Sequence, residues 1–255
     1  MRRLFHVMLE ASSLVADASA TSRLGALASL SDGDRRSLRS AAEFPQRIRA
    51  ARDLILAGQR SAGSLVVLDG WLGRVQLFSD GRRQILSFLL PGDVIQEPGT
   101  FQPVASSTIT ALSDAILCPA PASDSEGLRE AYAASAALDE VNLLRHVARL
   151  GRMSAFERIH DWLLEIHERL LLAGRAGPDG FAMPLTQEML ADALGLTSVH
   201  VNRTVQAMRR EGVLEWRGGM VRLKRNTTAA TQAAPRERFQ PGAALPVSRN
   251  LLVSG

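Results

Sequence analysis

Arginine has the widest recognition chemistry in this sequence, because Lys224 is the only lysine among 30 basic residues. A guanidinium group donates two parallel hydrogen bonds, which suits the oxygens of a phosphate and the O6 and N7 atoms of guanine. Residues 175–225 hold eight basic and five acidic side chains, whereas the whole chain has a net charge of +4. Most of the excess charge therefore lies in one fifth of the chain, as an electrostatic surface for nucleic acid requires.

Residue patterns for metal binding and catalysis are scarce. The single cysteine, Cys118, excludes an internal disulfide framework and an iron–sulfur cluster held by this chain. None of the five histidines falls between residues 7 and 145; they are His6, His146, His160, His167 and His200. A histidine-held metal in that region is excluded, and neither a nucleophile elbow nor a Walker A loop occurs. We therefore predict a protein that is not an enzyme and that needs no cofactor or metal.

The segment 186–205 fits a helix-turn-helix throughout; it runs TQEMLADALGLTSVHVNRTV. Thr186 and Thr197 stand where they would cap the two helices, and Gly195 can adopt the positive φ that the turn needs. The angle between the helices would be filled by Leu190, Leu194, Val201 and Val205, and Ala191 is small where the second helix must cross closely. In this motif the first exposed residues of the second helix face the major groove of DNA. Residues 213–223, with Arg217-Gly218-Gly219 at their centre, predict a short hairpin wing.

Residues 45–118 are typical of a compact β domain. Short apolar or alternating stretches are separated by turn residues, at 53–56, 64–68, 71–78, 84–90 and 107–118. Asp69-Gly70 and Ser79-Asp80-Gly81 are hairpin signals, and Pro91-Gly92-Asp93 closes a further strand. Many short strands at this spacing indicate a sandwich or a barrel.

Residues 125–150 predict a long helix. A narrow seam of the coiled-coil kind recurs at spacings of four and three, formed by Ala137, Val141, Leu144, Ala148 and Gly151. A second apolar face is added by Leu143, Val147 and Leu150. We interpret the seam as intermolecular, with a fully buried core helix as the alternative. Ser154 and Glu157 form a capping box that starts a new helix after a bend near Gly151.

The length of 255 residues allows two small domains, and 46% apolar residues is ordinary for a globular protein. We expect a flexible leader over residues 1–26 and a disordered tail over 226–255. No apolar run is long enough to cross a membrane, and Glu10 interrupts the faint signal-peptide pattern at the start. A cytoplasmic protein is therefore expected.

Together these segments resemble the CRP/FNR family of bacterial transcription regulators. The resemblance covers residues 27–225 and is most specific at 80–85, 90–93 and 185–204. It implies an α+β fold: an antiparallel β-roll or jelly-roll of the cyclic-nucleotide-binding type (27–123), a dimerisation helix (124–151) and a winged helix-turn-helix (152–225). It further implies a homodimer that binds double-stranded DNA at a palindromic site and regulates transcription, with RNA polymerase as a candidate partner.

The family's DNA contacts carry over residue by residue. The residues that match the family's base contacts are Ser198, Val199, Asn202 and Arg203. Among them, Arg203 matches the arginine that binds guanine. The residues that match the family's phosphate contacts are Thr186, Thr197 and His200. Val199 stands where many members have a glutamate that accepts a hydrogen bond from cytosine. Because valine can only touch a thymine methyl, the best-known half-site of the family is not carried over.

The effector site departs further from the family. Members that bind cyclic AMP hold its phosphate with an Arg-Ser pair, which here corresponds to Ala105-Ser106. No arginine lies between Arg83 and Arg129, so a cyclic phosphate would lose its water without gaining a cation. Glu97 and Ser106 remain candidate pocket residues for an unidentified small-molecule effector other than classical cyclic AMP.

Two other classes of function stay open at this level. The helix-turn-helix could be the protein-docking module of a small-molecule sensor, which predicts no retention of DNA at moderate salt. A jelly-roll enzyme is the second alternative, and the missing histidines oppose it.

Overall fold

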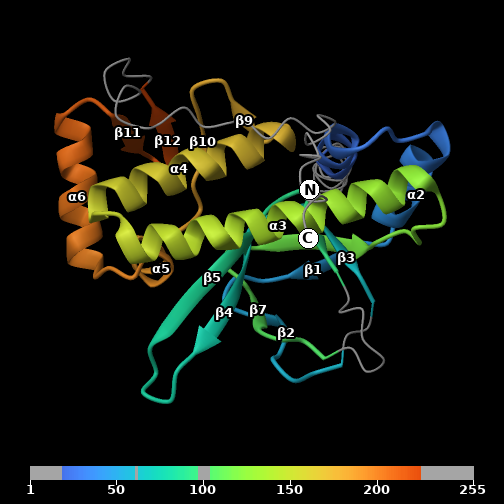
Figure 1. Ribbon diagram of the computed structural model, residues 1–255, viewed down its shortest axis with the longest axis horizontal. Helices are drawn as coiled ribbons and strands as arrows, with labels where there is room; N and C mark the ends of the chain where they lie inside the picture. Colours follow the sequence, from blue (N-terminus) through green and yellow to red (C-terminus); the bar gives the residue numbers. More distant parts are fainter. Residues whose placement is uncertain (1–18, 61–62, 97–103, 225–255) are drawn as a thin grey trace, which may run out of the picture. The chain divides into compact units, whose positions relative to one another are not determined.

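The computed structural model of the protein describes residues 19–60, 63–96 and 104–224. A short helix over residues 19–27 and helix α2 (Asp32–Ala42) come first, followed by a β-roll. Two long helices and a C-terminal module of helices and short strands complete the described chain (Figure 1). The predicted α+β class is confirmed: a β-roll, a long helix and a winged helix-turn-helix follow in that order.

Two antiparallel sheets of four strands each form the β-roll. The first sheet has the order β1 (Gln46–Ile48), β8 (Ala115–Pro119), β3 (Leu65–Asp69), β6 (Val94–Ile95). The second has the order β2 (Asp53–Ile55), β7 (Thr108–Ala111), β4 (Leu72–Leu77), β5 (Arg83–Leu89). Side chains from both sheets meet in one apolar core, made of Val67, Leu72, Leu89, Ile95, Ile109, Ala115 and Leu117. The alternation of buried and half-buried residues along β7 is what a strand with one face in this core requires.

The Asp69-Gly70 turn does not close a hairpin, so this sequence prediction is wrong. β3 pairs with β6 and β8, whereas β4 pairs with β5 and β7, and the chain crosses between the sheets at this turn. Gly70 has a φ of +80°, and a Cβ atom there would lie 2.1 Å from the carbonyl oxygen of Asp114. The glycine is therefore required by a close approach between two turns. The predicted hairpin at Ser79–Gly81 does form, between β4 and β5.

Residues 19–26 are helical, although the sequence predicted that the flexible leader extended to residue 26. Leu24 is fully buried, in an apolar cluster that includes Val66, Val94 and Leu128. The side chain of Arg23 is buried too, and its guanidinium lies 2.8 Å from a carboxylate oxygen of Asp93. Burial of an arginine depends on this distant partner, which no local pattern reveals. The rest of the predicted leader, residues 1–18, and the predicted tail at 226–255 lie outside the described residues.

Helices α3 (Glu126–Arg152) and α4 (Ala155–Leu172) connect the β-roll to the C-terminal module. The α3 helix begins after Ser125, whose Oγ accepts a hydrogen bond from the Leu128 N–H at 3.1 Å. It ends where Met153 becomes extended, with φ −95° and ψ 144°. Ser154 then caps α4 and forms the predicted capping box with Glu157. The helical conformation is therefore interrupted at Met153, and the cap satisfies the backbone donors with which α4 begins.

Buried ion pairs hold α3 against α4. The guanidinium of Arg149, on α3, lies 2.7 Å from Asp161 and 2.6 Å from Glu165, both on α4. Arg145 also contacts Asp161, at 2.8 Å. Burial by itself would raise the pKa of Asp161, but hydrogen bonds from Arg145 and Arg149 outweigh it and bring this pKa to about 2. The Asp161 carboxylate is therefore ionised at neutral pH.

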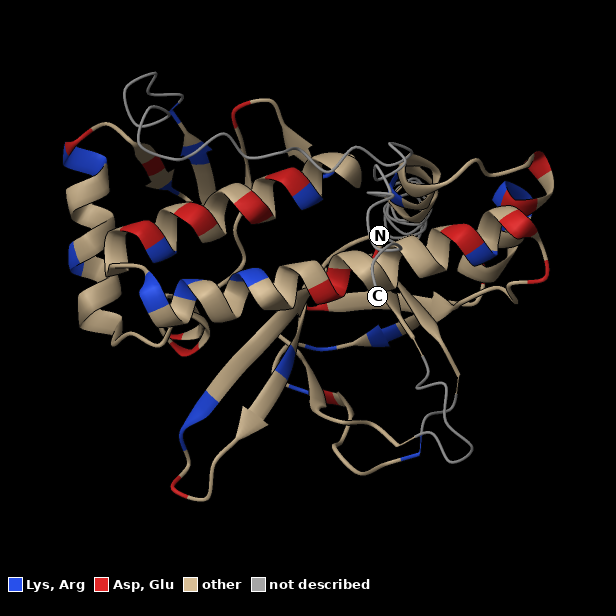
Figure 2. Cartoon of the chain, in the orientation of Figure 1, with Lys and Arg blue, Asp and Glu red and all other residues tan. Residues whose placement is uncertain are grey.

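The same chain of charges continues into the β-roll. Arg169 of α4 contacts Glu165 at 3.4 Å and Asp93 at 2.7 Å, and Asp93 also holds Arg23. Asp93 is fully buried in the turn after β5. We call these residues the ion-pair network: Arg23, Asp93, Arg145, Arg149, Asp161, Glu165 and Arg169. Figure 2 shows acidic residues along α4 beside basic residues on the C-terminal half of α3.

We expect Arg149→Met to lower the free energy of unfolding by about 3 kcal/mol, because the buried carboxyl groups of Asp161 and Glu165 would lose the guanidinium that they share. Chemical denaturation at pH 7 measures the change. Arg152→Met is the matched control: it removes an exposed arginine from the same helix, and its effect should stay within about 0.5 kcal/mol. Equal stabilities of the two variants would contradict a structural role for the network.

Candidate nucleic-acid interface

The C-terminal module contains two short helices, α5 (Gln187–Leu194) and α6 (Ser198–Arg210). Both predicted N-caps are confirmed. The Oγ1 of Thr186 accepts from the Met189 N–H at 3.2 Å, and the Oγ1 of Thr197 accepts from the His200 N–H at 3.2 Å. Each cap satisfies a backbone donor at a helix start, so the ends of both helices are fixed.

The turn between α5 and α6 is set by Gly195. Its φ of 63° and ψ of 40° place it in the left-handed region, and its N–H donates to the carbonyl oxygen of Ala191. This confirms the predicted positive-φ position. An L side chain is strained in this conformation, so glycine is the residue type that fits this turn between α5 and α6 without strain.

An apolar core fixes the two helices on α4. The predicted positions Leu190, Leu194, Val201 and Val205 are all buried. They share one cluster with four α4 residues, Ile159, Trp162, Leu163 and Ile166. The α4 helix is thus the platform on which the motif is built, and the opposite side of α6 remains available to solvent.

The candidate base-reading residues lie together on this solvent side of α6. Ser198, Val199, Asn202 and Arg203 are all exposed, and Val199 is 76% exposed. Positions four apart share one side of a helix, so these four residues form a single surface. The Nδ2 of Asn202 donates to the Oε1 of Gln187 at 3.0 Å, which ties this surface to α5. Within the described chain, no hydrogen bond or ion pair involves the guanidinium of Arg203.

The candidate phosphate contacts border the same surface. Thr186 and Thr197 are exposed and His200 is half-buried. Both threonine hydroxyls already accept a backbone hydrogen bond, but a hydroxyl keeps its own proton to donate. The three residues therefore present donors at the starts of both helices, where the partial positive charge of the helix dipole also favours an anion.

The wing belongs to a sheet of four strands with the order β11-β12-β10-β9. The predicted hairpin is confirmed between β11 (Leu214–Arg217) and β12 (Met220–Leu223), and its turn residues Gly218 and Gly219 both have positive φ. The sequence pattern did not predict the other two strands, β9 (Ala176–Gly177) and β10 (Gly180–Ala182). They are too short to show alternation, although the aromatic Phe181 was an available signal in the sequence, and the structure buries it.

The β-roll touches the motif directly through β5. Arg83 forms an ion pair with Asp192 of α5, and the Nε2 of Gln84 donates to the carbonyl oxygen of Ala193 at 2.8 Å. The sequence did not predict these contacts, because each joins two residues that are far apart in the chain. They place the hairpin β4–β5 against the first helix of the motif.

Of the two candidate effector residues, only Ser106 belongs to the part of the chain that the structure describes. Ser106 is exposed in the bend before β7, and Glu97 lies outside the described residues. Among the described residues no group of three or more His, Cys, Asp or Glu could hold a metal ion. In that same part of the chain, no helix is both long and apolar enough to cross a membrane.

The predicted apolar seam of α3 is exposed in the single chain. Four large side chains stand out, with exposed fractions of 52% for Val141, 44% for Leu143, 62% for Leu144 and 61% for Val147. Ala137, Ala148 and Gly151 are exposed on the same helix. The alternative of a fully buried core helix is therefore wrong, because the residues that would fill a core face outward.

Taken together, fold and surface define a protein with a cyclic-nucleotide-binding type β-roll and a winged helix-turn-helix. Residues 45–132 match the family model of the cyclic nucleotide-binding domain, and residues 157–226 match that of the Crp-like helix-turn-helix domain.

Two curated relatives are transcription and nitrogen-fixation regulators. The transcriptional activator protein FnrL of Cereibacter sphaeroides is 34% identical over 180 residues, which are 67% of this chain and 72% of that protein. The nitrogen fixation regulation protein FixK of Bradyrhizobium diazoefficiens is 32% identical over 155 residues, 58% of this chain and 64% of that protein. The solved structure of FixK2 from Bradyrhizobium japonicum has a TM-score of 0.65 and 26% identity, covering 75% of this chain and 97% of that one.

The chain belongs to the CRP/FNR family of transcription regulators. It is a DNA-binding regulator of transcription and not an enzyme.

Gly195→Ala should lower the free energy of unfolding by about 1–2 kcal/mol, through the strained backbone alone. A Cβ atom would have room, since its nearest neighbours would be Leu150 Cδ2 at 3.5 Å and Arg158 Nη1 at 3.7 Å. Gly195→Asn is the control, because asparagine tolerates the left-handed region and should cost less. Thermal denaturation compares the three proteins, and an alanine variant as stable as the wild type would contradict the assignment.

Proposed function

We propose that this protein acts as a homodimer that recognises a palindromic DNA site through α6 and so regulates transcription. The observation that carries the proposal is the exposed side of α6, where four residues able to contact bases stand on a helix fixed by two caps and a packed core. A DNA-reading helix needs this combination, because its side chains must be free while its backbone is rigid.

Base recognition is proposed for Ser198, Val199, Asn202 and Arg203. The Arg203 guanidinium is suited to the O6 and N7 atoms of guanine, and the methyl groups of Val199 to a thymine methyl. Asn202 could pair with adenine if its hydrogen bond to Gln187 is exchanged for one to a base. Thr186, Thr197 and His200 would fix the register of the protein by donating to phosphates.

Dimerisation is proposed through the exposed seam of α3. Val141, Leu144 and Val147 expose more than half of their side chains to water, and pairing with a second copy would bury this apolar surface. A two-fold axis along α3 would place two α6 helices to read half-sites about 34 Å apart, one turn of DNA. The two half-sites would then be inverted copies, which makes the whole site palindromic.

Control of this dimer is proposed to involve a small molecule bound by the β-roll. The absence of arginine between Arg83 and Arg129 supports an effector other than classical cyclic AMP. RNA polymerase is the partner that a transcription regulator would contact, and the cytoplasm is where both would meet bacterial DNA.

Arg203→Ala is expected to weaken binding to the selected site by about 1–3 kcal/mol and to remove the preference for guanine at one position in each half-site. Selection from random duplexes followed by fluorescence anisotropy measures both effects. Arg36→Ala, which removes an exposed arginine from α2, is the control and should leave affinity and preference unchanged. Equal binding of specific and random DNA by the wild type would contradict the proposed function. Absence of binding at moderate salt would favour the protein-docking alternative.

Leu144→Glu should convert the dimer to a monomer, because two carboxylates would meet in an apolar seam, at a cost of about 3 kcal/mol or roughly a hundredfold in Kd. Analytical ultracentrifugation measures the equilibrium. Leu171→Glu on α4 changes a residue that is also partly exposed, 42% against 62% for Leu144, and should leave the dimer intact. A dimer of Leu144→Glu with wild-type affinity would place the interface elsewhere.

A further inference from the structure

A hydrogen bond between two side chains joins the helices of the motif beside the exposed side of α6. The Nδ2 of Asn202, at the start of the second turn of α6, donates to the Oε1 of Gln187, the first residue of α5, at 3.0 Å. Gln187 is half-buried, whereas Asn202 is exposed. The sequence pattern does not assign Gln187 to the DNA contacts, yet the first helix of the motif reaches a candidate base-reading residue through it.

Both ends of this hydrogen bond are attached to a fixed backbone. Gln187 follows the capping residue Thr186, and its helix is anchored by the fully buried Leu190. Asn202 follows Val201, which is fully buried in the cluster that includes the α4 residues. Because caps and core already fix the two helices, the bond restrains the side chain of Asn202 rather than the angle between the helices.

The amide of Asn202 keeps a donor and an acceptor for a ligand. Its Nδ2 carries two hydrogens that point in different directions, and one of them is held by Gln187. Within the described residues, no group donates a hydrogen bond to its Oδ1. Exchange of the bond to Gln187 is one route to a base contact, and a second route leaves this bond in place. In the second route, the remaining N–H and the Oδ1 of Asn202 together face a base edge.

This pattern of one donor and one acceptor matches adenine. In the major groove adenine offers its N6 amino group as a donor and N7 as an acceptor, and an asparagine amide pairs with both at once. Guanine offers two acceptors there, O6 and N7, so it would repel an amide oxygen turned toward it. An amide that turns freely about its last torsion has two roughly equivalent orientations. Holding that torsion fixed therefore distinguishes adenine from guanine.

We propose that Gln187 is a positioning residue, which holds the amide of Asn202 in the orientation that reads adenine. The inference deepens the proposed function, since it rests on α6 entering the major groove. Gln187 then contributes to the choice of base without contacting that base. The guanine contact proposed for Arg203 is separate, because within the described chain no hydrogen bond joins Arg203 to either amide.

The test is the base preference of Gln187→Ala, measured by selection from random duplexes and by fluorescence anisotropy on the selected site. The position read by Asn202 is the one where Asn202→Ala loses its preference, and the wild type should select adenine there. Ordering a free side chain on binding weakens its contact roughly twofold to tenfold, so Gln187→Ala should lower the preference for adenine by this factor in each half-site. Combined with Asn202→Ala, it should have no further effect at that position, since the residue that it positions is gone.

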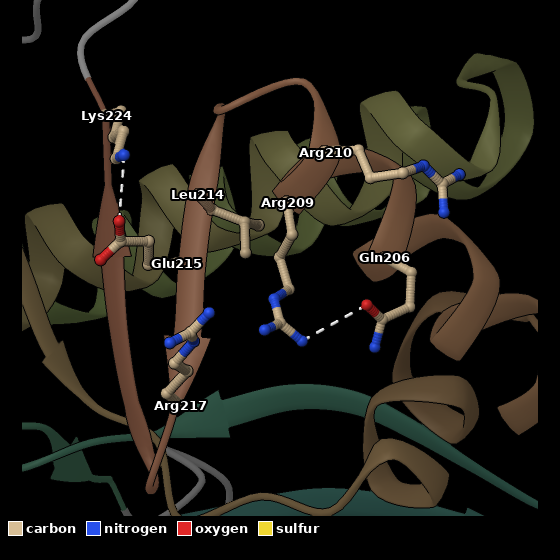
Figure 3. Close-up of a pocket in the computed structure, with 7 residues that line it drawn as sticks. All are labelled: Gln206, Arg209, Arg210, Leu214, Glu215, Arg217 and Lys224. Atoms are coloured by element: carbon tan, nitrogen blue, oxygen red, sulfur yellow. Dashed lines mark hydrogen bonds and ion pairs between the residues drawn. The ribbon is translucent and has the colours of Figure 1, made fainter.

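Gln187→Glu tests whether acceptance of the hydrogen bond is the relevant property. Its carboxylate accepts from Asn202 as the amide oxygen does, so the preference for adenine should match the wild type, while the added negative charge weakens binding to every duplex. Gln206→Ala is the matched control. Gln206 is an exposed glutamine of α6 whose Oε1 accepts from Arg209 at 3.3 Å (Figure 3), and its loss should leave the preference for adenine unchanged.

A second measurement needs no DNA. In NMR relaxation of the free protein, the order parameter of the Asn202 side-chain amide should be lower in Gln187→Ala than in the wild type and in Gln206→Ala. Circular dichroism melting verifies that all variants are folded. An equally ordered Asn202 amide in Gln187→Ala would overturn the inference, because Gln187 would then not restrain it.

Three results on DNA would also overturn the inference. The first is selection of guanine at the position read by Asn202, and the second is an unchanged preference for adenine in Gln187→Ala. The third is an equal loss at the guanine chosen by Arg203, because Gln187 would then support the whole helix instead of one side chain. Equal binding of specific and random DNA by the wild type would contradict the proposed function and the inference with it. This failure is distinguishable, since the first two results leave the preference for guanine at Arg203 intact.

Discussion

The ion-pair network is the interaction on which the rest of this structure depends. Arg149 joins α3 to α4 through Asp161 and Glu165, and Arg169 joins α4 to the β-roll through Asp93. Buried charges are expensive to remove from water, and apolar residues of similar size would hold the helices together at least as strongly. What charges add is direction, because a forked arginine binds a carboxylate well in few orientations. The network therefore specifies how α4 lies relative to α3.

This orientation matters because α4 carries the whole C-terminal module. Leu190, Leu194 and Val201 pack with Trp162 of α4, so α6 moves as α4 moves. In a dimer joined along α3, the angle between α3 and α4 would set the distance between the two α6 helices. A second contact, the ion pair between Arg83 of the β-roll and Asp192 of α5, joins the β-roll directly to the same module. A ligand that altered the β-roll would thus have a physical route to α6, although control of this kind requires two states that differ in their affinity for DNA.

Local chemistry made much of this fold predictable. Ser154 and Glu157, Thr186, Thr197 and Gly195 each act on neighbours within a few residues, and the structure has all of them in the predicted capping and turn positions. The errors arose where the partner is far away in the chain. Asp69-Gly70 has the residues of a hairpin, but its conformation is fixed by the approach of Asp114. Residues 19–26 were expected to belong to a flexible leader, because the partner that buries Arg23 is Asp93, which is far away in the chain.

Net charge alone says little about DNA binding in this protein, because the arginines fall into two groups. Arg23, Arg149 and Arg169 are buried, and each lies against one or more carboxylates, so their charges are largely compensated before they reach the surface. Arg203 and Arg217 are exposed, and in the described chain neither forms an ion pair. A net charge of +4 over 255 residues is thus consistent with a strong local field, provided that the uncompensated guanidinium groups gather at α6 and the wing. The same residue type stabilises the fold where it has a carboxylate partner and leaves its donors available to phosphates and bases where it has none.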